Sequence, residues 1–253
     1  MKANEGLSVL VTGGGSGIGE ATARYFAERG GKVTICGRRA EKIKAAAASI
    51  GGNCHGVVAD VTRDADRKRM IEEAVAFGGG LDALVNNAAN TAWGAITELQ
   101  AETILDILNT NVVAGMMLTG LAAPHLAQRK GAVIFIGSIH TRRAFPGASP
   151  YAASKGAVQV LTKVLAAELG AQGVRVNCVL PGAVLTEINI RAGVLDAESA
   201  AKRLEGLVPL HALDRVGKAE EIAEAIDYLV RAEWTTGALL DVDGGLGLGK
   251  SKL

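Results

Sequence analysis

Short apolar runs rich in β-branched residues alternate with longer segments of helical periodicity along almost the whole chain. Seven apolar runs predict buried strands, at residues 7–12, 33–36, 54–59, 81–85, 132–137, 174–180 and 238–242. Six further segments predict helices, at residues 20–29, 41–50, 64–77, 101–128, 151–170 and 218–231. Strands that alternate with helices in this way predict a seven-stranded parallel sheet with right-handed crossovers, a doubly wound α/β fold with helices on both faces.

The chain shows no linker, repeat or low-complexity tract, so we expect a single domain over residues 1–253. Residues 186–213 lack a clear period and follow the sixth predicted strand. Ligands of open parallel sheets bind at the carboxyl ends of the strands. We therefore expect residues 186–213 to form a lid on the substrate side, and residues 246–253 to form a short tail.

A glycine cluster follows the first predicted strand, with the pattern Thr12-Gly13-x-x-x-Gly17-Ile18-Gly19. Glycines at a strand-to-helix turn let the backbone approach a phosphate, and the helix N-terminus supplies amide donors and a partial positive charge. The spacing departs from the general G-x-G-x-x-G fingerprint of dinucleotide-binding proteins. A glycine-rich turn without a binding function is the alternative.

Ser138, Tyr151 and Lys155 form a second group of candidate functional residues. Tyr151 and Lys155 lie four residues apart at the start of a predicted helix, so their side chains share one face. A phenol has a pKa near ~10, and a neighbouring ammonium lowers that pKa toward the range where proton transfer is efficient. Ser138 follows the fifth strand, where its hydroxyl can meet the tyrosine. An ordinary exposed Tyr–Lys pair is the alternative.

Five motifs in a fixed order resemble the short-chain dehydrogenase/reductase family, including features of its glucose 1-dehydrogenase branch. They are the glycine cluster, Asn86-Asn87-Ala88, Ser138 with Tyr151-x-x-x-Lys155, Pro181-Gly182 and Asp243-Gly244-Gly245. The resemblance extends from about Gly6 to Gly245 and implies a Rossmann-type fold with a nicotinamide cofactor. Ala89 departs from the family's Asn-Asn-Ala-Gly, which adds a methyl group and removes no functional group.

The resemblance implies a catalytic tetrad of Asn111, Ser138, Tyr151 and Lys155. Ser138 is expected to bond the substrate carbonyl, Tyr151 to transfer the proton, and Lys155 to lower the tyrosine pKa and hold the cofactor ribose. Asn111 is expected to link Lys155 to solvent through a water; an asparagine bonded to its own helix backbone is the alternative. Cofactor contacts are implied at Gly13, Gly15, Ser16, Gly17, Ile18, Gly19, Asp60, Val61, Asn87, Ala88, Tyr151, Lys155, Pro181, Gly182, Val184 and Thr186.

The residues after the second strand favour NADP(H) over NAD(H). NAD-preferring sites place an acid there to hold the ribose 2′-hydroxyl, whereas an arginine accommodates the 2′-phosphate of NADP. The sequence here is Gly37-Arg38-Arg39, without an acid. Arg38 is the first candidate for the phosphate and Arg39 the second; solvated arginines are the alternative. Asp60 has an alternative too, because it can simply cap the next turn.

The residues around Ser138 suggest a hydroxylated substrate. His140 lies two residues after Ser138, and Ser-x-His together with Asn189 is similar to the glucose 1-dehydrogenase branch, which implies a sugar or polyol. A histidine that only packs is the alternative for His140. Arg142 and Arg143 would suit an anionic substrate if either pointed inward. The rival activities are a 3-oxoacyl-thioester reductase and, from another class, a dinucleotide-binding sensor without catalysis, against which the intact tetrad argues.

Composition excludes several classes of partner and site. The formal charge is +1, which points to neither nucleic acid nor an anionic membrane surface. We expect no membrane span, because no apolar run looks long enough, and no signal peptide, because the start of the chain is short and polar. Three cysteines in apolar runs fit reduced thiols, and the four histidines have no metal-ligand spacing, so we expect no metal. We favour the cytoplasm; Ser251-Lys252-Leu253 keeps a peroxisomal location open.

Two predicted helices have apolar side chains around more of their circumference than packing against the sheet requires. Residues 101–128 and 151–170 each carry apolar side chains beyond a single stripe. Apolar surface of this kind usually marks a partner interface, and two-fold contacts about two axes give a tetramer. The family resemblance implies the same assembly, so we expect a homotetramer. Internal cover by residues 186–213 is the alternative.

Overall fold

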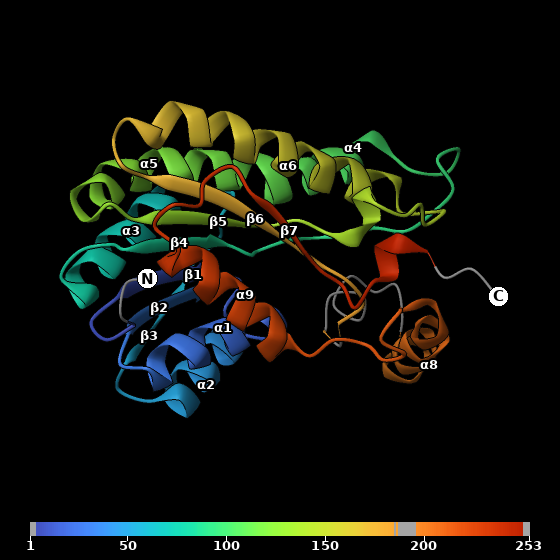
Figure 1. Cartoon of the computed structure of the whole chain (residues 1–253), viewed down its shortest axis with the longest axis horizontal. Coiled ribbons are helices and arrows are strands. Elements are labelled where there is room, and N and C mark those ends of the chain that lie inside the picture. Colours follow the sequence, from blue (N-terminus) through green and yellow to red (C-terminus); the bar gives the residue numbers. More distant parts are fainter. Residues whose placement is uncertain (1–3, 185, 187–195, 250–253) are drawn as a thin grey trace.

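Seven parallel strands form one sheet at the centre of the computed structural model, which describes residues 4–184, 186 and 196–249 (Figure 1). The strand order is β3-β2-β1-β4-β5-β6-β7. The strands are β1 (Ser8–Thr12), β2 (Lys32–Gly37), β3 (Cys54–Val58), β4 (Ala83–Asn86), β5 (Ala132–Ile136), β6 (Arg175–Pro181) and β7 (Leu239–Val242). The predicted Rossmann-type, doubly wound α/β fold is confirmed, and the order reverses between β1 and β4, where such folds bind ligands.

Helices cover both faces of the sheet (Figure 1). One face carries α3 (Asp64–Gly78), α4 (Ala101–Leu108), α5 (Ala114–Arg129) and α6 (Ser149–Gly170). The other face carries α1 (Gly17–Glu28), α2 (Ala40–Ile50) and α9 (Ala219–Arg231). A further helix, α8 (Ala197–Leu207), stands apart from both layers at the carboxyl ends of the strands (Figure 1). It lies in the part of the chain where a lid was expected.

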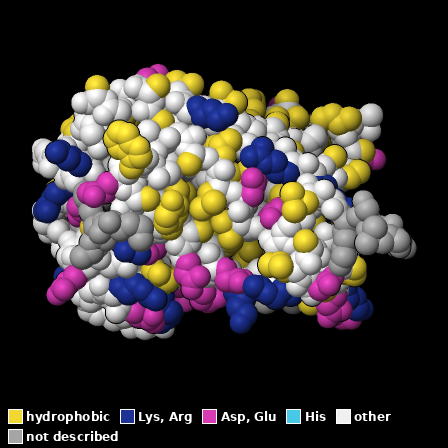
Figure 2. Space-filling model, viewed as in Figure 1, with side chains coloured by type: hydrophobic (Ala, Val, Ile, Leu, Met, Phe, Trp, Pro, Cys, Tyr) yellow, Lys and Arg dark blue, Asp and Glu magenta, His cyan; other side chains and the backbone are white. Residues whose placement is uncertain are grey.

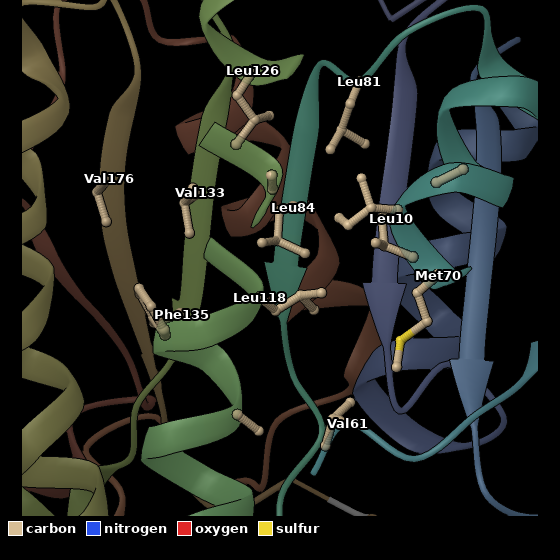
Figure 3. Packing of buried hydrophobic residues seen from close by; sticks show 14 of the residues in the cluster. Leu10, Val61, Met70, Leu81, Leu84, Leu118, Leu126, Val133, Phe135 and Val176 are labelled. Carbon is tan, nitrogen blue, oxygen red and sulfur yellow. The ribbon is translucent and has the colours of Figure 1, made fainter. Parts of the chain in front are cut away.

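The core lies on both sides of the sheet because successive side chains of a strand point to opposite faces. Figure 3 shows one side, where Leu10 and Leu84 from neighbouring strands pack with Leu118 of α5. Their neighbours Val9 and Val85 point to the other side. Full burial of one such side chain contributes about 1.5–3 kcal/mol. This two-sided burial is why the strands read as nearly continuous apolar runs rather than as alternating patterns.

The segment predicted as one helix over residues 101–128 is divided. A turn of π-helix at Asn109–Val113 joins α4 to α5. A π-turn widens the helix locally and often occurs at functional sites. Here it contains the buried Asn111. The polar residues that interrupt the apolar pattern therefore mark a real change of helix geometry.

One helical stretch, Ala101–Arg129, is long and apolar enough to cross a membrane by length and composition. The expectation that no such stretch exists was therefore wrong. Its buried residues Leu118 and Leu126 belong to the core that packs on the sheet. The stretch is thus explained as a core helix.

The outer surface of α4, α5 and α6 exposes apolar side chains (Figure 2). Leu105, Met116, Met117, Val160 and Val164 are all exposed there. The described residues of α8 do not cover this surface, since α4, α5 and α6 lie above the sheet in the view of Figure 1 and α8 lies below it at the lower right.

Candidate active site

Two adjoining pockets open along the carboxyl ends of the central strands. The outer pocket lies beside β2 and β3, and the inner cleft lies between β5, β6 and α8; Gly13, Ala88 and Ala89 line both. The outer pocket contains the predicted residues Gly13, Gly15, Arg38, Arg39, Asp60, Val61 and Ala88. The inner cleft contains Gly13, Ser16, Gly17, Ile18, Asn87, Ala88, Ser138, His140, Tyr151, Lys155, Pro181, Gly182, Val184 and Thr186. The fold thus brings most predicted residues together.

The glycine cluster forms a tight turn that only glycine fits. Gly13 and Gly17 have φ values of +67° and +57°, in the left-handed region. A Cβ at Gly13 would come within 3.0 Å of the Asn87 side chain, and one at Gly19 would collide with the carbonyl oxygen of Gly13. Gly19, which lines neither pocket, therefore closes the turn. Ser16 makes no side-chain cap at the start of α1, so its hydroxyl leaves the first amides of that helix to a ligand.

Thr12, which the sequence analysis named in the glycine pattern without giving it a role, joins the ends of β1 and β4. Its hydroxyl accepts hydrogen bonds from the backbone N–H groups of Asn87 (3.0 Å) and Ala88 (2.9 Å). The Asn87 side-chain amide donates to the Thr12 carbonyl at 2.8 Å. That amide therefore supports the glycine turn from within. The backbone at Ala89 does not have a positive φ, so the extra methyl group causes no backbone strain there.

The outer pocket is rich in cations. Arg39 donates to the Ser16 hydroxyl at 2.9 Å, which places a guanidinium beside the glycine turn. Arg38 is 60% exposed and lies 4.0 Å from the carboxylate of Asp60, a weak contact. Lys42, in the first turn of α2, also lines this pocket and was not predicted. A pocket with three cations and one acid fits a phosphate group.

Asp60 has two roles in this arrangement. Its carboxylate accepts hydrogen bonds from the backbone N–H (2.9 Å) and the hydroxyl (2.8 Å) of Thr62. The capping that was set out as an alternative is therefore present. Because Asp60 also lines the outer pocket, capping fixes its position at the pocket wall.

Lys155, Tyr151 and Ser138 meet in the inner cleft. The Lys155 ammonium is buried, with 3% of the residue exposed, and donates to the carbonyl of Ile136 at 2.7 Å. Its Nζ lies 5.5 Å from the centre of the Tyr151 ring. Tyr151 and Ser138 are hydrogen-bonded to each other. The helical spacing and the strand end thus produce the predicted cluster.

Asn111 lies behind this cluster and bonds outside its own helix. Its side-chain amide donates to Ser154 Oγ and to the carbonyl of Asn90, both at 2.9 Å, and its oxygen accepts from the Asn90 N–H at 2.7 Å. The alternative that it bonds its own backbone is not what the structure shows. A small cavity lined by both Asn111 and Lys155 separates the two side chains.

Burial controls the proton affinities of the cluster. It lowers the pKa of Lys155 to about 8. Burial also raises the pKa of Tyr151, and the hydrogen bond to Ser138 opposes this rise. The net pKa of Tyr151 is therefore raised, so the lowering expected from Lys155 does not prevail in the protein as described. Desolvation of the phenolate outweighs an ammonium that is 5.5 Å from the ring centre and already bonded to Ile136.

His140 lies in the inner cleft, as predicted. Its Nδ1 is 3.0 Å from the hydroxyl of Ser138, and its ring packs against Phe145 and Tyr151, with centroid distances of 4.5 and 5.2 Å. Burial, with smaller effects from the cations Arg203 and Lys155, lowers the pKa of His140 to about 4. The ring is therefore neutral at pH 7.

Other substrate-side expectations have different outcomes. Asn189, residues 187–195 of the expected lid and the Ser251-Lys252-Leu253 ending lie outside the described residues. Arg142 forms an ion pair with Asp241 at 3.1 Å, and neither it nor Arg143 lines the inner cleft. The cleft residues that sequence reasoning missed include Trp93, Phe145, Arg203, Leu204, Leu207 and Leu246. No motif marks them, because loops and helices from distant parts of the chain deliver them.

The residues that the structure describes include no group of three His, Cys, Asp or Glu side chains placed to hold a metal ion. All three cysteines are free thiols, and burial raises the pKa of Cys36 to about 12 and that of Cys178 to about 11. These two thiols are thus protonated and unreactive at neutral pH.

Comparison with known proteins gives a consistent result. The family model described as short chain dehydrogenase matches residues 8–193. A glucose 1-dehydrogenase of Gluconobacter oxydans is 36% identical over 96% of this chain and 92% of its own length. A putative ketoacyl reductase of the granaticin polyketide synthase of Streptomyces violaceoruber is also 36% identical, over 96% and 97%. A solved short-chain dehydrogenase/reductase of unknown function from Caenorhabditis elegans superimposes with a TM-score of 0.91 at 29% identity, covering 99% of this chain and 98% of that one.

The low pKa of His140 predicts how stability changes in acid. Its pKa is near 4 in the folded protein and 6.5 as a free side chain, so the unfolded chain binds the proton first as the pH falls. The contribution of His140 therefore lowers the free energy of unfolding progressively as the pH falls from about 6.5 to about 4. In His140→Asn we expect the free energy of unfolding to fall less between pH 7 and pH 4.5 than in the wild type, by about 2 kcal/mol.

Urea unfolding at the two pH values measures this difference. His125→Asn, on α5 and outside the cleft, is the matched control. Equal acid sensitivity of the wild type and His140→Asn would show that the folded protein does not hold His140 neutral.

Proposed function

Because the chain belongs to the short-chain dehydrogenase family and is an NAD(P)-dependent dehydrogenase/reductase, we propose that it interconverts a secondary alcohol and a ketone with NADP(H). One observation carries the proposal. Ser138, Tyr151 and Lys155 converge in a cleft that adjoins both the glycine turn and a pocket lined by Arg38 and Arg39.

The described residues fit a dinucleotide. The glycine turn is too tight for a Cβ at Gly13 or Gly19, and its helix amides face a position suited to phosphate. Lys155 supplies a buried cation for a ribose hydroxyl, and Val184 and Thr186 line the inner cleft on the side of β6. When bound, the nicotinamide supplies or accepts the hydride.

The side chains of the protein supply the proton and the electrostatic stabilisation. In reduction, Ser138 donates a hydrogen bond to the substrate oxygen as negative charge develops there. Tyr151 gives its proton to the same oxygen. Because burial raises the pKa of Tyr151, the phenol is protonated at pH 7 and ready to act as the acid. Lys155 then stabilises the resulting phenolate with its charge.

Asn111 positions the route by which this proton is replaced. The cavity between Asn111 and Lys155 has room for a water, and polar groups line it on both sides. The hydrogen bonds from Asn111 to Asn90 and Ser154 fix its orientation. We therefore assign Asn111 to a proton relay that runs through a water to Lys155.

The preference for NADP(H) rests on the charge of the outer pocket. Arginine binds phosphate in a bidentate manner, and Arg38 is exposed and only weakly paired. Arg39 and Lys42 stand beside it. Since no acid follows β2, nothing in that position accepts a hydrogen bond from a free ribose 2′-hydroxyl.

A sugar or polyol is the substrate class we favour. His140 adds a polar ring beside Ser138, which suits a hydroxylated substrate. The relative named glucose 1-dehydrogenase supports the same substrate class. The 3-oxoacyl-thioester reductase remains the second candidate, because the ketoacyl reductase relative is equally similar. The alternative of a dinucleotide-binding sensor without catalysis gives no reason for the four tetrad side chains to lie close together.

The exposed apolar face of α4, α5 and α6 supports a homotetramer. Val160 is 66% exposed on α6, and Met116 and Met117 on α5 are exposed as well. Small residues on α6, such as Gly156, meet nothing that would block close helix approach. We propose that these helices pair about two-fold axes. A cytoplasmic location fits the three free cysteines.

The general-acid role of Tyr151 predicts the behaviour of Tyr151→Phe. We expect turnover to fall by at least about 10³-fold while NADPH still binds, because only the transferable proton is lost. Ketone reduction and NADPH fluorescence titration measure the two effects. Tyr25→Phe on α1 is the control. Retention of more than a few per cent of wild-type kcat would disprove the role.

The cofactor assignment predicts that Arg38→Asp raises KM for NADPH and improves the use of NADH. An acid there repels the 2′-phosphate and accepts a hydrogen bond from a ribose hydroxyl. kcat/KM with each cofactor is the measurement, and Lys44→Asp on the exposed side of α2 is the control. A wild type that prefers NADH would contradict the assignment.

The assembly proposal predicts a tetramer by sedimentation or light scattering at micromolar concentration. Val160→Asp should dissociate it, because a carboxylate would be buried against the partner helix. Val58→Asp, at an exposed apolar position on β3, should leave the assembly intact. An active wild-type monomer would show that the exposed face has another purpose.

A further inference from the structure

Arg203 of α8 places a partly buried cation in the inner cleft. Its guanidinium lies 3.9 Å from the centre of the Trp93 ring, and the Trp93 ring lies 6.0 Å from that of His140. His140 in turn packs on Tyr151, with ring centroids 5.2 Å apart. Arg203 thus stands at the end of a continuous row of side chains that begins at the proposed proton donor.

No acid balances this cation within the described structure. None of the described residues that line the inner cleft is an aspartate or glutamate, and no ion pair to Arg203 occurs among them. Residues three and four positions away on α8 are Ser199, Ala200, Gly206 and Leu207, so its own helix offers no partner either. A cation held in a cleft without a counter-ion is a site for an anionic group.

Two further polar atoms in the same row lack partners. Nε1 of Trp93 and Nε2 of His140 are buried and have no hydrogen bond among the described residues. Buried polar groups are normally bonded, so each is an open position for a ligand. Trp93 can only donate, which suits an anion beside Arg203.

His140 complements this with an acceptor. If Ser138 gives its one proton to the substrate oxygen, the ring must donate from Nδ1 to Ser138, and Nε2 then carries a lone pair. A neutral imidazole has this arrangement available at pH 7. The cleft therefore offers an acceptor for a substrate hydroxyl near the reacting carbon and donors for an anion farther out.

We infer that the substrate is a hydroxylated carboxylate, a sugar acid or a related hydroxy acid, whose carboxylate binds Arg203 and Trp93. The inference rests on the proposed alcohol–ketone activity and narrows it from neutral sugars to their acids. Arg203 takes the part that Arg142 or Arg143 would have taken for an anionic substrate if either had pointed inward. Those two residues do not line the cleft, and Arg142 is paired with Asp241.

Matched ketones test this selectivity during turnover with NADPH. The pairs are 5-keto-D-gluconate with L-sorbose, and 3-oxobutanoate with 4-hydroxy-2-butanone, which differ in a carboxylate against a hydroxymethyl group. We expect kcat/KM to be higher for the carboxylate of each pair by about 10- to 100-fold, the effect of one charge-assisted contact. Arg203→Gln should remove the difference and leave NADPH binding unchanged. Arg203→Lys should retain part of it.

Lys202→Gln is the control, because it removes a positive charge from the same helix outside the cleft. It should leave the ratio within each pair unchanged. If Arg203 only held α8 against Trp93, Arg203→Gln would reduce the rates for both members of a pair equally. That result, or a wild type without preference for the carboxylates, would overturn the inference.

A binding measurement separates this inference from the proposed activity. The chain has two tryptophans, and Trp234 is fully exposed, so Trp234→Phe leaves Trp93 as the only fluorophore of its kind. In that variant, with Tyr151→Phe added to prevent turnover and NADP⁺ present, gluconate should change the Trp93 emission at a Kd at least about tenfold below that of glucitol. Arg203→Gln should abolish the difference. Equal binding of the two probes, or binding of neither, would refute the carboxylate site even if ketones are reduced.

Discussion

The buried ammonium of Lys155 is the constraint around which the site is built. With 3% exposure it is desolvated, and the carbonyl of Ile136 at the end of β5 accepts a hydrogen bond from it. Removing an ammonium from water costs several kcal/mol unless polar groups surround it, which is why the pKa of Lys155 falls to about 8. The contact fixes α6 against β5. Tyr151 lies on α6 one turn before Lys155, and Ser138 follows Ile136 by two residues, so both are held close to the ammonium.

The fold supplies what this cluster lacks on either side. On the side of β1 and β2, the glycine turn and the cations of the outer pocket provide for phosphates. On the side of α8, Trp93 and Arg203 close the inner cleft with donors, and no acid is found among the described residues that line it. Behind the cluster, the π-turn directs Asn111 toward a small cavity shared with Lys155. Chemistry at Tyr151 is therefore placed between a cofactor side and a substrate side that differ in their polar groups.

Local sequence patterns were enough to predict the fold and many residues of the site. Seven apolar runs predicted seven strands because burial on both faces leaves little room for polar residues, and Tyr151 with Lys155 shares a helix face by period alone. Arg203 and Trp93 could not be foreseen, since they meet only through the path of α8 and of the loop after β4. The rise of the Tyr151 pKa was also missed. Spacing reveals a neighbouring charge, whereas desolvation depends on everything that packs around the phenol.

The central claim is that one continuous cleft holds NADP(H) and presents it to Tyr151. A crystal structure of the protein with NADP⁺ tests this most directly. The account predicts the 2′-phosphate within hydrogen-bond distance of Arg38 or Arg39, the pyrophosphate at the start of α1, and the nicotinamide beside Tyr151 and Ser138. A cofactor whose 2′-phosphate faces solvent, or whose nicotinamide lies away from Tyr151, would contradict it.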